Sequence, residues 1–237
     1  MTYSQINHPK GWGILKMKEK LKVLNLYAGI GGNRKLWDGD IEVTAIEIRP
    51  KIAKQYQKHF PNDKVIVDDA HQYLIKHYKE FDFIWSSPPC PSHSKIRMMA
   101  SKAEADKDKN RNTYDEIFPD MKLYEEIIFL DHYFKGKWVV ENVISYYEPL
   151  IKPQKVGKHF FWSNFIINQF RIKSRNHMGN IDELQNKVGF DLDGCDLGHR
   201  KDQVLRNCVE PKLGKHIFDC AFRIEQKLLS EVSGNSS

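Results

Sequence analysis

The chain has 237 residues, 41% of them hydrophobic, which is enough for the core of one sizeable domain, with or without a small lobe. Its formal net charge of +6 favours an acidic partner, although charge alone does not identify one. No apolar run approaches the ~20 residues of a membrane span, and no signal core follows Met1. The four cysteines are widely scattered, so we expect free thiols and a cytoplasmic protein without a membrane partner.

Strand and helix patterns alternate along most of the chain. Apolar runs typical of strands occur at residues 23–28, 43–48, 65–67, 81–87 and 138–143. Helical patterns occur at residues 50–60, 70–78 and 114–134, and a last amphipathic pattern at 213–229. The alternation predicts an α/β fold, with a mostly parallel sheet and helices on both faces.

Two stretches interrupt this alternation. Residues 93–112 hold six Lys or Arg against three Asp or Glu and follow Cys90 directly, so we expect a mobile active-site lid. A solvated surface loop is the alternative. Residues 164–203 show little helical periodicity, and 170–177 alternate apolar and basic residues, as in a strand with one charged face. The alternative there is an ordinary edge strand protected by charge.

A glycine loop follows the first predicted strand, in Ala28-Gly29-Ile30-Gly31-Gly32. Glycines allow backbone to approach a ligand, but the spacing is neither that of a dinucleotide fingerprint nor that of a phosphate loop. Glu47 ends the second strand, where an acid binds ribose hydroxyls, and Asp68-Asp69 follow the third. These features predict an adenosine cofactor without a pyrophosphate, S-adenosylmethionine rather than NAD, with Tyr27 against it. A solvated strand-end acid is the alternative for Glu47.

Cys90 follows the fourth predicted strand, in Ser86-Ser87-Pro88-Pro89-Cys90. The two prolines stiffen a turn that presents a thiol at a strand end, where ligands bind in α/β sheets. The fifth strand ends in Glu141 and Asn142. A nucleophile, an acid and a glycine loop in one sheet indicate covalent catalysis beside a nucleotide-like cofactor. A buried inert thiol is the alternative for Cys90.

Taken together, these motifs resemble those of the DNA cytosine-5 methyltransferases, in the family's order and over about residues 21–225. The matching segments are Asn25-Leu26-Tyr27-Ala28-Gly29-Ile30-Gly31-Gly32, Ser87-Pro88-Pro89-Cys90-Pro91, Glu141-Asn142-Val143 and Arg206-Asn207-Cys208-Val209. The resemblance implies a Rossmann-like S-adenosylmethionine-dependent methyltransferase fold with a small recognition lobe. It also implies S-adenosylhomocysteine as the second product.

The resemblance assigns roles to individual residues. Cys90 would add to carbon-6 of a cytosine rotated out of double-stranded DNA, Glu141 would hold the ring nitrogen and its proton, and Asn142 would brace the loop. The implied cofactor-binding residues are Tyr27, Ala28, Gly29, Gly31, Gly32, Glu47, Ile48, Asp68, Asp69, Pro88, Asn207 and Val209.

The chain departs from the family at the element that usually supplies two arginines after a glutamine. Gln154 matches, but Val156 and Lys158 stand at the arginine positions. We expect Lys158 to keep the cationic role toward the target base, with His159 as the alternative, although lysine lacks the planar fork of arginine. Arg206 also replaces a usual glycine.

The division of the chain follows from the same comparison. Residues 1–163 would form the catalytic core, 164–203 a short target-recognition region, and 204–230 a segment returning to the core. A short region implies a short target, of about two to four base pairs. Candidate DNA contacts are Ser92, Lys95 and Arg97 after the nucleophile, and Arg171, Lys173, Arg175 and Asn176 in the recognition region.

Other functions stay open at this point. An RNA enzyme acting on tRNA usually carries Pro-Pro-Cys-Gln and Cys-Phe-Thr motifs, which this chain lacks. A catalytically silent DNA-binding relative is left open by Val156 and Lys158. The glycine pattern disfavours an oxidoreductase, and Cys195 with His199 is too small a set for a metal site. We expect a monomeric, phage-borne or orphan enzyme of the bacterial cytosol; the sequence does not reveal a partner restriction nuclease.

Overall fold

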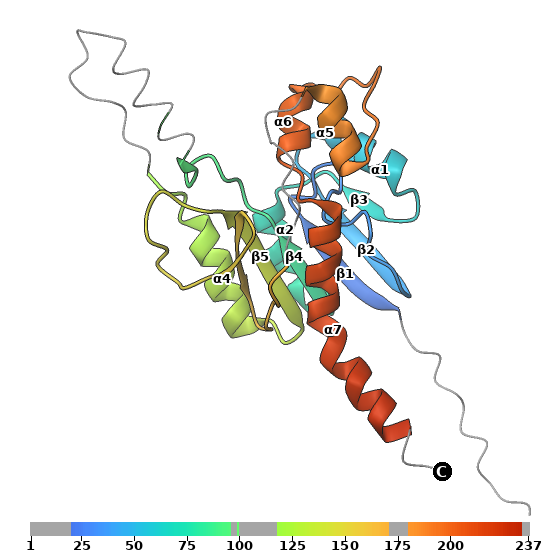
Figure 1. Ribbon diagram of the computed structural model, residues 1–237, viewed down its shortest axis with the longest axis vertical. Coiled ribbons are helices and arrows are strands. Elements are labelled where there is room, and N and C mark those ends of the chain that lie inside the picture. Colours follow the sequence, from blue (N-terminus) through green and yellow to red (C-terminus); the bar gives the residue numbers. More distant parts are fainter. Residues whose placement is uncertain (1–19, 96–98, 100–117, 171–179, 234–237) are drawn as a thin grey trace, which may run out of the picture.

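A seven-stranded sheet forms the centre of the molecule in the computed structural model, which describes residues 20–95, 99, 118–170 and 180–233, with side chains as far as residue 222. The strands lie in the order β3-β2-β1-β4-β5-β7-β6 (Figure 1). Strands β1 to β5 run parallel, and β7 runs antiparallel to both β5 and β6. The bounds are β1 Leu21–Leu26, β2 Ile41–Ile46, β3 Lys64–Ile66, β4 Phe83–Ser86, β5 Lys137–Val143, β6 Gln154–Val156 and β7 His159–Ser163.

The helices begin and end where local sequence signals place them. Pro50 opens α1, where its missing N–H is not needed, and the Asp69 side chain accepts a hydrogen bond from the Gln72 amide at the start of α2. The bounds are α1 Pro50–His59, α2 Ala70–His77, a 3₁₀ turn Tyr78–Glu80, α4 Lys122–Tyr133, α5 Ile181–Val188, α6 Lys201–Arg206 and α7 Pro211–Ser233.

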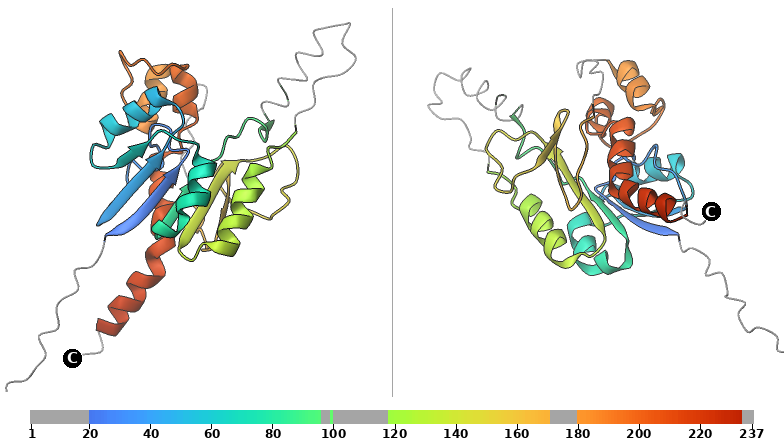
Figure 2. Two further views of the ribbon diagram at one scale, coloured as in Figure 1. Left: turned by 180° about the vertical axis from the view of Figure 1, so that it is seen from behind. Right: turned by 60° about the horizontal axis from the view of Figure 1, so that its bottom comes forward.

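Helices cover both faces of the sheet, because successive strand side chains point to opposite sides. Val23 and Phe83 face α7, where Leu213 and Ile217 complete one apolar cluster. Alternate residues such as Leu24 face α2 and α4 and form a second cluster. Figure 2 shows α7 on the opposite side of the sheet from α2 and α4. This arrangement confirms the predicted α/β fold with a mostly parallel sheet.

Helices α5 and α6 pack against the main body rather than standing apart from it (Figure 1). Leu184 and Val188 of α5 and Val204 of α6 share a buried cluster with Ile30 of the glycine loop and Ile52 of α1. The expectation of little helical periodicity in residues 164–203 was therefore wrong.

Helix α5 carries both end signals of a short helix. Asn180 accepts a hydrogen bond from the Glu183 amide at its start, and Gly189 ends it with a left-handed φ of 68°. Within the eight residues of α5, Leu184 and Val188 form the buried face of the helix.

Helix α4 is shorter than the predicted helix at 114–134. Residues 118–120 are not helical, and the helix begins at Lys122. Pro119 disfavours helical backbone at Phe118, which explains a later start. Residues 114–117, most of the basic stretch at 93–112 and residues 171–177 of the predicted charged strand lie outside the described residues. Among the helices that the structure describes, none has the length and apolar character needed to cross a lipid bilayer.

Candidate active site

The sheet brings the sequence motifs to one edge. The glycine loop follows β1, Glu47 follows β2 and Cys90 follows the end of β4, while Glu141 lies near the end of β5. Since these strands are parallel neighbours, their carboxyl ends meet at the same edge, where ligands bind in open α/β sheets.

Glu141 lies close enough to Cys90 for its negative charge to act on the thiol. The thiol is half-buried, and burial raises its pKa, with a further rise from the negative charge of Glu141. The thiol is therefore protonated at neutral pH in the free protein. Since the thiolate is the nucleophile, Cys90 must lose its proton before or during any covalent step.

Asn142 ties β5 to the turn that carries Cys90. Its Nδ2 donates to the Pro88 carbonyl at 3.1 Å, and its Oδ1 accepts from the Val143 amide at 2.9 Å. Both Asn142 and Pro88 are buried. This contact gives Asn142 the geometry that the predicted bracing role needs.

Glu141 has a hydrogen-bond partner that differs from the predicted cation. Nδ1 of His159 lies 2.7 Å from Oε1 of Glu141, and the Glu141 residue is only 7% exposed. Lys158 lies exposed in the turn between β6 and β7, and no contact recorded among the described residues joins it to Glu141. The structure therefore brings His159, not Lys158, against the candidate acid.

Glu47 and Gly29 are joined directly at the predicted cofactor site. The Gly29 amide donates to Oε2 of Glu47 at 3.0 Å, while the backbone amide and Nε of Arg49 donate to Oε1. Glu47 is 4% exposed, so the alternative of a solvated strand-end acid does not hold.

Gly29, Gly31 and Gly32 of this loop have different surroundings, and two of them leave no room for a side chain. A side chain on Gly31 would meet the Tyr56 ring, and one on Gly32 would lie 2.6 Å from the Val209 carbonyl oxygen. Val209 of the late sequence element therefore lies against the glycine loop. A side chain on Gly29 would meet no atom within 4 Å, so the backbone there borders open space.

A buried carboxylate links the cofactor side of the site to the catalytic side. Glu126 of α4 is 0% exposed, and its Oε1 accepts from the Tyr27 hydroxyl at 2.6 Å. Its Oε2 accepts from Ser86 Oγ at 2.6 Å, and Nδ1 of His71 lies 3.1 Å from Oε1. Tyr27 begins the glycine loop and Ser86 ends β4, so one carboxylate fixes both segments.

The Glu126 network was not predicted from the sequence, because a glutamate in a helical pattern usually indicates a solvated face. The pKa of the Tyr27 hydroxyl is raised well above its ordinary value by burial and by Glu126. The hydrogen bond to Glu126 raises the pKa of His71. Tyr27 also has a positive φ of 55°, which is uncommon outside glycine.

The remaining cofactor candidates differ in their accessibility. Asp69 caps α2, whereas Asp68 is exposed and its Oδ1 accepts from the Asp69 amide. Ile48 is 61% exposed just after the end of β2.

The late sequence element supplies further candidates. Asn207 is exposed and accepts a hydrogen bond from Gln203 at 2.8 Å. Ala28 and Val209 are buried. Asp68 and Ile48 are thus more accessible to a ligand than Asp69.

Only part of the predicted nucleic-acid surface lies within the described residues. Ser92 Oγ accepts a hydrogen bond from the Asp120 amide at 3.0 Å, which ties the start of the loop to the start of α4. Lys95 is exposed. The other predicted DNA contacts lie outside the described residues: Arg97, Arg171, Lys173, Arg175 and Asn176.

The strand-end groups fit S-adenosylmethionine. Its ribose hydroxyls need acceptors, and Glu47 offers a buried carboxylate beside an unobstructed backbone at Gly29. An exposed acid at Asp68 and an exposed apolar side chain at Ile48 match the amine and the ring of adenine. No pyrophosphate-binding glycine spacing is present, which agrees with a cofactor that lacks phosphates.

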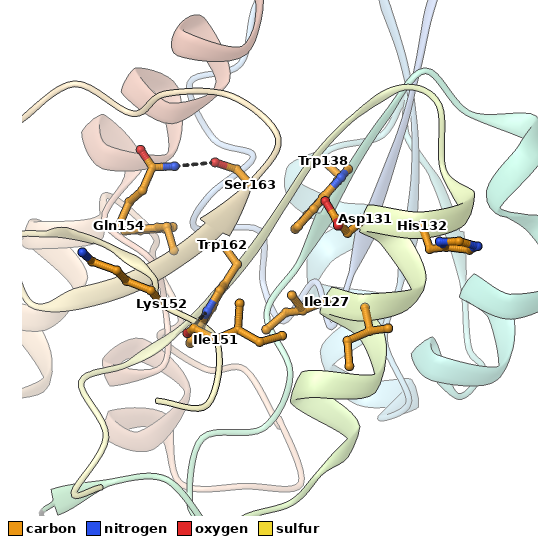
Figure 3. A pocket seen from close by; sticks show the side chains of 11 residues that line it. Ile127, Asp131, His132, Trp138, Ile151, Lys152, Gln154, Trp162 and Ser163 are labelled. Atoms are coloured by element: carbon orange, nitrogen blue, oxygen red, sulfur yellow. Dashed lines mark hydrogen bonds between the residues drawn. The ribbon is translucent and has the colours of Figure 1, made fainter. Parts of the chain in front are cut away.

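A pocket of about 350 Å³ lies elsewhere, between α4 and the β6–β7 hairpin. Figure 3 shows Ile127, Trp138, Ile151 and Trp162 around it, with a hydrogen bond between Gln154 and Ser163. None of the predicted catalytic or cofactor-binding residues lines this pocket.

Comparisons with known proteins agree with the family that the motifs indicate. The model of the C-5 cytosine-specific DNA methylase family matches residues 21–122. A comparison with curated proteins gave no match.

Similar solved structures include three methyltransferases. The Entamoeba histolytica methyltransferase EhMeth is 12% identical, with a TM-score of 0.49 over 87% of this chain and 99% of that one. A mutant DNMT2 from Spodoptera frugiperda is 24% identical, with a TM-score of 0.34 over 52% of this chain and 36% of that one. A SAM-dependent methyltransferase from Agrobacterium tumefaciens is 13% identical, with a TM-score of 0.35 over 54% and 40%.

The matched segment contains the glycine loop, Glu47 and the Cys90 turn, which are the motifs that build the described site. The strand order and the mostly parallel pairing give the chain a Rossmann-like α/β fold. The similarity to the C-5 cytosine-specific DNA methylase family is confined to residues 21–122, which is less than half of the chain.

Proposed function

We propose that the protein methylates carbon-5 of a cytosine in double-stranded DNA, through a covalent bond between Cys90 and the base. The observation that carries this proposal is the placement of Cys90 beside Glu141, with Asn142 bonded to the Pro88 carbonyl ahead of the thiol. A thiol, a proton donor and a fixed turn at one sheet edge are the groups that addition to a cytosine ring requires.

The residues divide the chemistry between them. Glu141 takes up a proton from solvent as the base binds, and the Cys90 thiol releases its proton to solvent. The sulfur then bonds to carbon-6, the electron pair of the C5=C6 double bond shifts toward carbon-5 and the ring nitrogen, and Glu141 gives its proton to that nitrogen. S-adenosylmethionine supplies the methyl group that carbon-5 accepts. A base then removes the carbon-5 proton, and the bond to Cys90 breaks by β-elimination. Proton transfer by a positioned acid such as Glu141 typically contributes ~10²–10⁴ in rate.

The raised pKa of Cys90 implies that activation follows substrate binding. Burial and Glu141 both disfavour the thiolate in the free protein. Once Glu141 holds a proton against the ring nitrogen, its negative charge no longer opposes ionisation of the thiol. We infer that binding of the base and activation of the nucleophile are coupled through Glu141.

Positive charges near the site support an anionic substrate. The positive charges of Lys158 and Lys187 both lower the pKa of His159. Their ammonium groups therefore lie near His159, the hydrogen-bond partner of Glu141. Lysines attract phosphate without reading sequence. A cytosine within a duplex must also leave the stack to reach Cys90, at a cost of a few kcal/mol. Lys95 and the uncharged Ser92 stay candidates for phosphate contacts beside the extruded base.

A trapping experiment tests the mechanism. DNA duplexes that carry 5-fluorocytosine should form a covalent complex, because fluorine cannot leave as the proton does. We expect a mass equal to protein plus DNA plus one methyl group, only with S-adenosylmethionine and only with Cys90 intact. The Cys90→Ala variant is the control, and a fluorinated RNA serves as a second substrate. Trapping of RNA alone would overturn the DNA assignment, and trapping by Cys90→Ala would overturn the nucleophile.

A further inference from the structure

Glu141 and His159 form a partly enclosed carboxylate–imidazole pair. Nδ1 of His159 and Oε1 of Glu141 are 2.7 Å apart, and the His159 side chain is 23% exposed. Within the described residues, no other side-chain hydrogen bond of the Glu141 carboxylate is recorded. Oε1 of the carboxylate is therefore engaged by the imidazole.

The sheet register explains why histidine occupies this place. Glu141 lies opposite Phe161 in the antiparallel β5–β7 pair, and His159 is two residues from Phe161. Side chains two residues apart share one face of a strand, so His159 and Phe161 lie on the face of Glu141. Lys158, one residue earlier, precedes β7 and lies exposed in the turn.

We propose that His159 is a positioning residue, whose imidazolium holds Glu141 in place and balances its charge as Glu141 gives up its proton. This inference rests on the proposed function. When the Glu141 carboxyl protonates the cytosine ring nitrogen, a carboxylate is left behind. Donation from Nδ1 of His159 stabilises that carboxylate. The proton that leaves Glu141 ends on the ring nitrogen, and His159 keeps its own.

The charged groups around His159 set the pH range in which it can act. Burial lowers its pKa, and so do Lys187 of α5 and Lys158 of the β6–β7 turn. The hydrogen bond and charge of Glu141 outweigh these effects, so the pKa of His159 is raised above 6.5. An arginine keeps its charge at any usable pH, whereas a histidine loses its charge as pH rises through this pKa.

An NMR titration of the full chain tests the pair without relying on activity. The imidazole signals of His159 should titrate above 6.5 in the wild type and below 6.5 in Glu141→Gln, because burial and the two lysines then act unopposed. Equal pKa values in the two proteins would overturn the inference. If the wild type transfers no methyl group at any pH, the proposed function fails, whereas the titration still decides whether the pair exists.

Kinetics test the role of the pair. His159→Gln should lower kcat ~10²-fold, with the KM for DNA little changed, because proton positioning acts on the transition state. His159→Arg should restore most of kcat and remove the loss of activity at alkaline pH. His132→Gln, on the outer side of α4, is the matched control and should leave both unchanged. If His159→Gln kept the pH profile of the wild type, the role would be refuted. It would also be refuted if Lys158→Gln, rather than His159→Gln, lowered kcat.

Discussion

Replacing Tyr27 by phenylalanine removes a single hydroxyl from the start of the glycine loop. That hydroxyl donates at 2.6 Å to Glu126, which is 0% exposed. The carboxylate keeps Ser86 and His71 but loses one of its two shortest hydrogen bonds. Because no solvent reaches Glu126, water cannot replace the lost donor.

The expected magnitude follows from this geometry. Hydrogen bonds to charged groups contribute ~1.5–3 kcal/mol, so Tyr27→Phe should lower the free energy of unfolding by about that amount. For a chain of this size, each kcal/mol lowers Tm by about 2–4 °C, which gives a total decrease of about 3–12 °C. Urea unfolding followed by tryptophan fluorescence measures the change, with an unaltered m-value.

Tyr133→Phe provides the matched control, since Tyr133 is 54% exposed at the end of α4. Its free energy of unfolding should change by less than ~0.5 kcal/mol, as is usual for surface substitutions. If Tyr27→Phe were as mild as Tyr133→Phe, the idea that Glu126 joins the two halves of the site would be refuted.

The same network predicts a pH dependence. The hydrogen bond to Glu126 raises the pKa of His71 above 6.5, so protonation of His71 stabilises the fold. That contribution is fully present below pH 6.5 and is lost as pH rises through the folded-state pKa. His71→Gln should therefore be more destabilising at about pH 6 than at about pH 8. A pH-independent difference from the wild type would contradict the pairing.

Three further substitutions test the site. Glu141→Gln should speed alkylation of Cys90 by iodoacetamide at neutral pH, because it removes a charge that raises the thiol pKa; an unchanged rate by mass spectrometry would contradict this. Gly32→Ala should cost ~1–3 kcal/mol in urea unfolding and weaken S-adenosylmethionine binding in calorimetry, since the new methyl group would lie 2.6 Å from the Val209 oxygen. Asn142→Ala should cost ~1–3 kcal/mol by leaving a buried carbonyl unpaired, and slow methyl transfer; unaltered stability and kinetics would exclude the bracing role.

Much of the site follows from local sequence patterns. The strand-like runs that end at the glycine loop, Glu47 and Cys90 predicted the parallel strands, and parallel strands bring their carboxyl ends together. The closeness of Cys90 and Glu141 also follows once β4 and β5 are neighbours. These features depend on short-range hydrophobic patterning, which a single sequence displays directly.

The other features depend on contacts between distant segments. His159 faces Glu141 only because β7 reverses direction and pairs with β5 in one particular register, and a shift of one residue would have presented Lys158 instead. Glu126 is buried because Tyr27 and Ser86 approach α4 from two different strands. Neither arrangement has a local sequence signal.

The most direct test of the central claim is nucleoside mass spectrometry. Unmethylated DNA and a tRNA are incubated in parallel with the protein and S-adenosylmethionine, using the wild type and Cys90→Ala. We predict 5-methylcytosine in the DNA with the wild type alone, and none in the tRNA. Methylation of the tRNA alone, methylation by Cys90→Ala, or no modified base in either nucleic acid would contradict the proposed function.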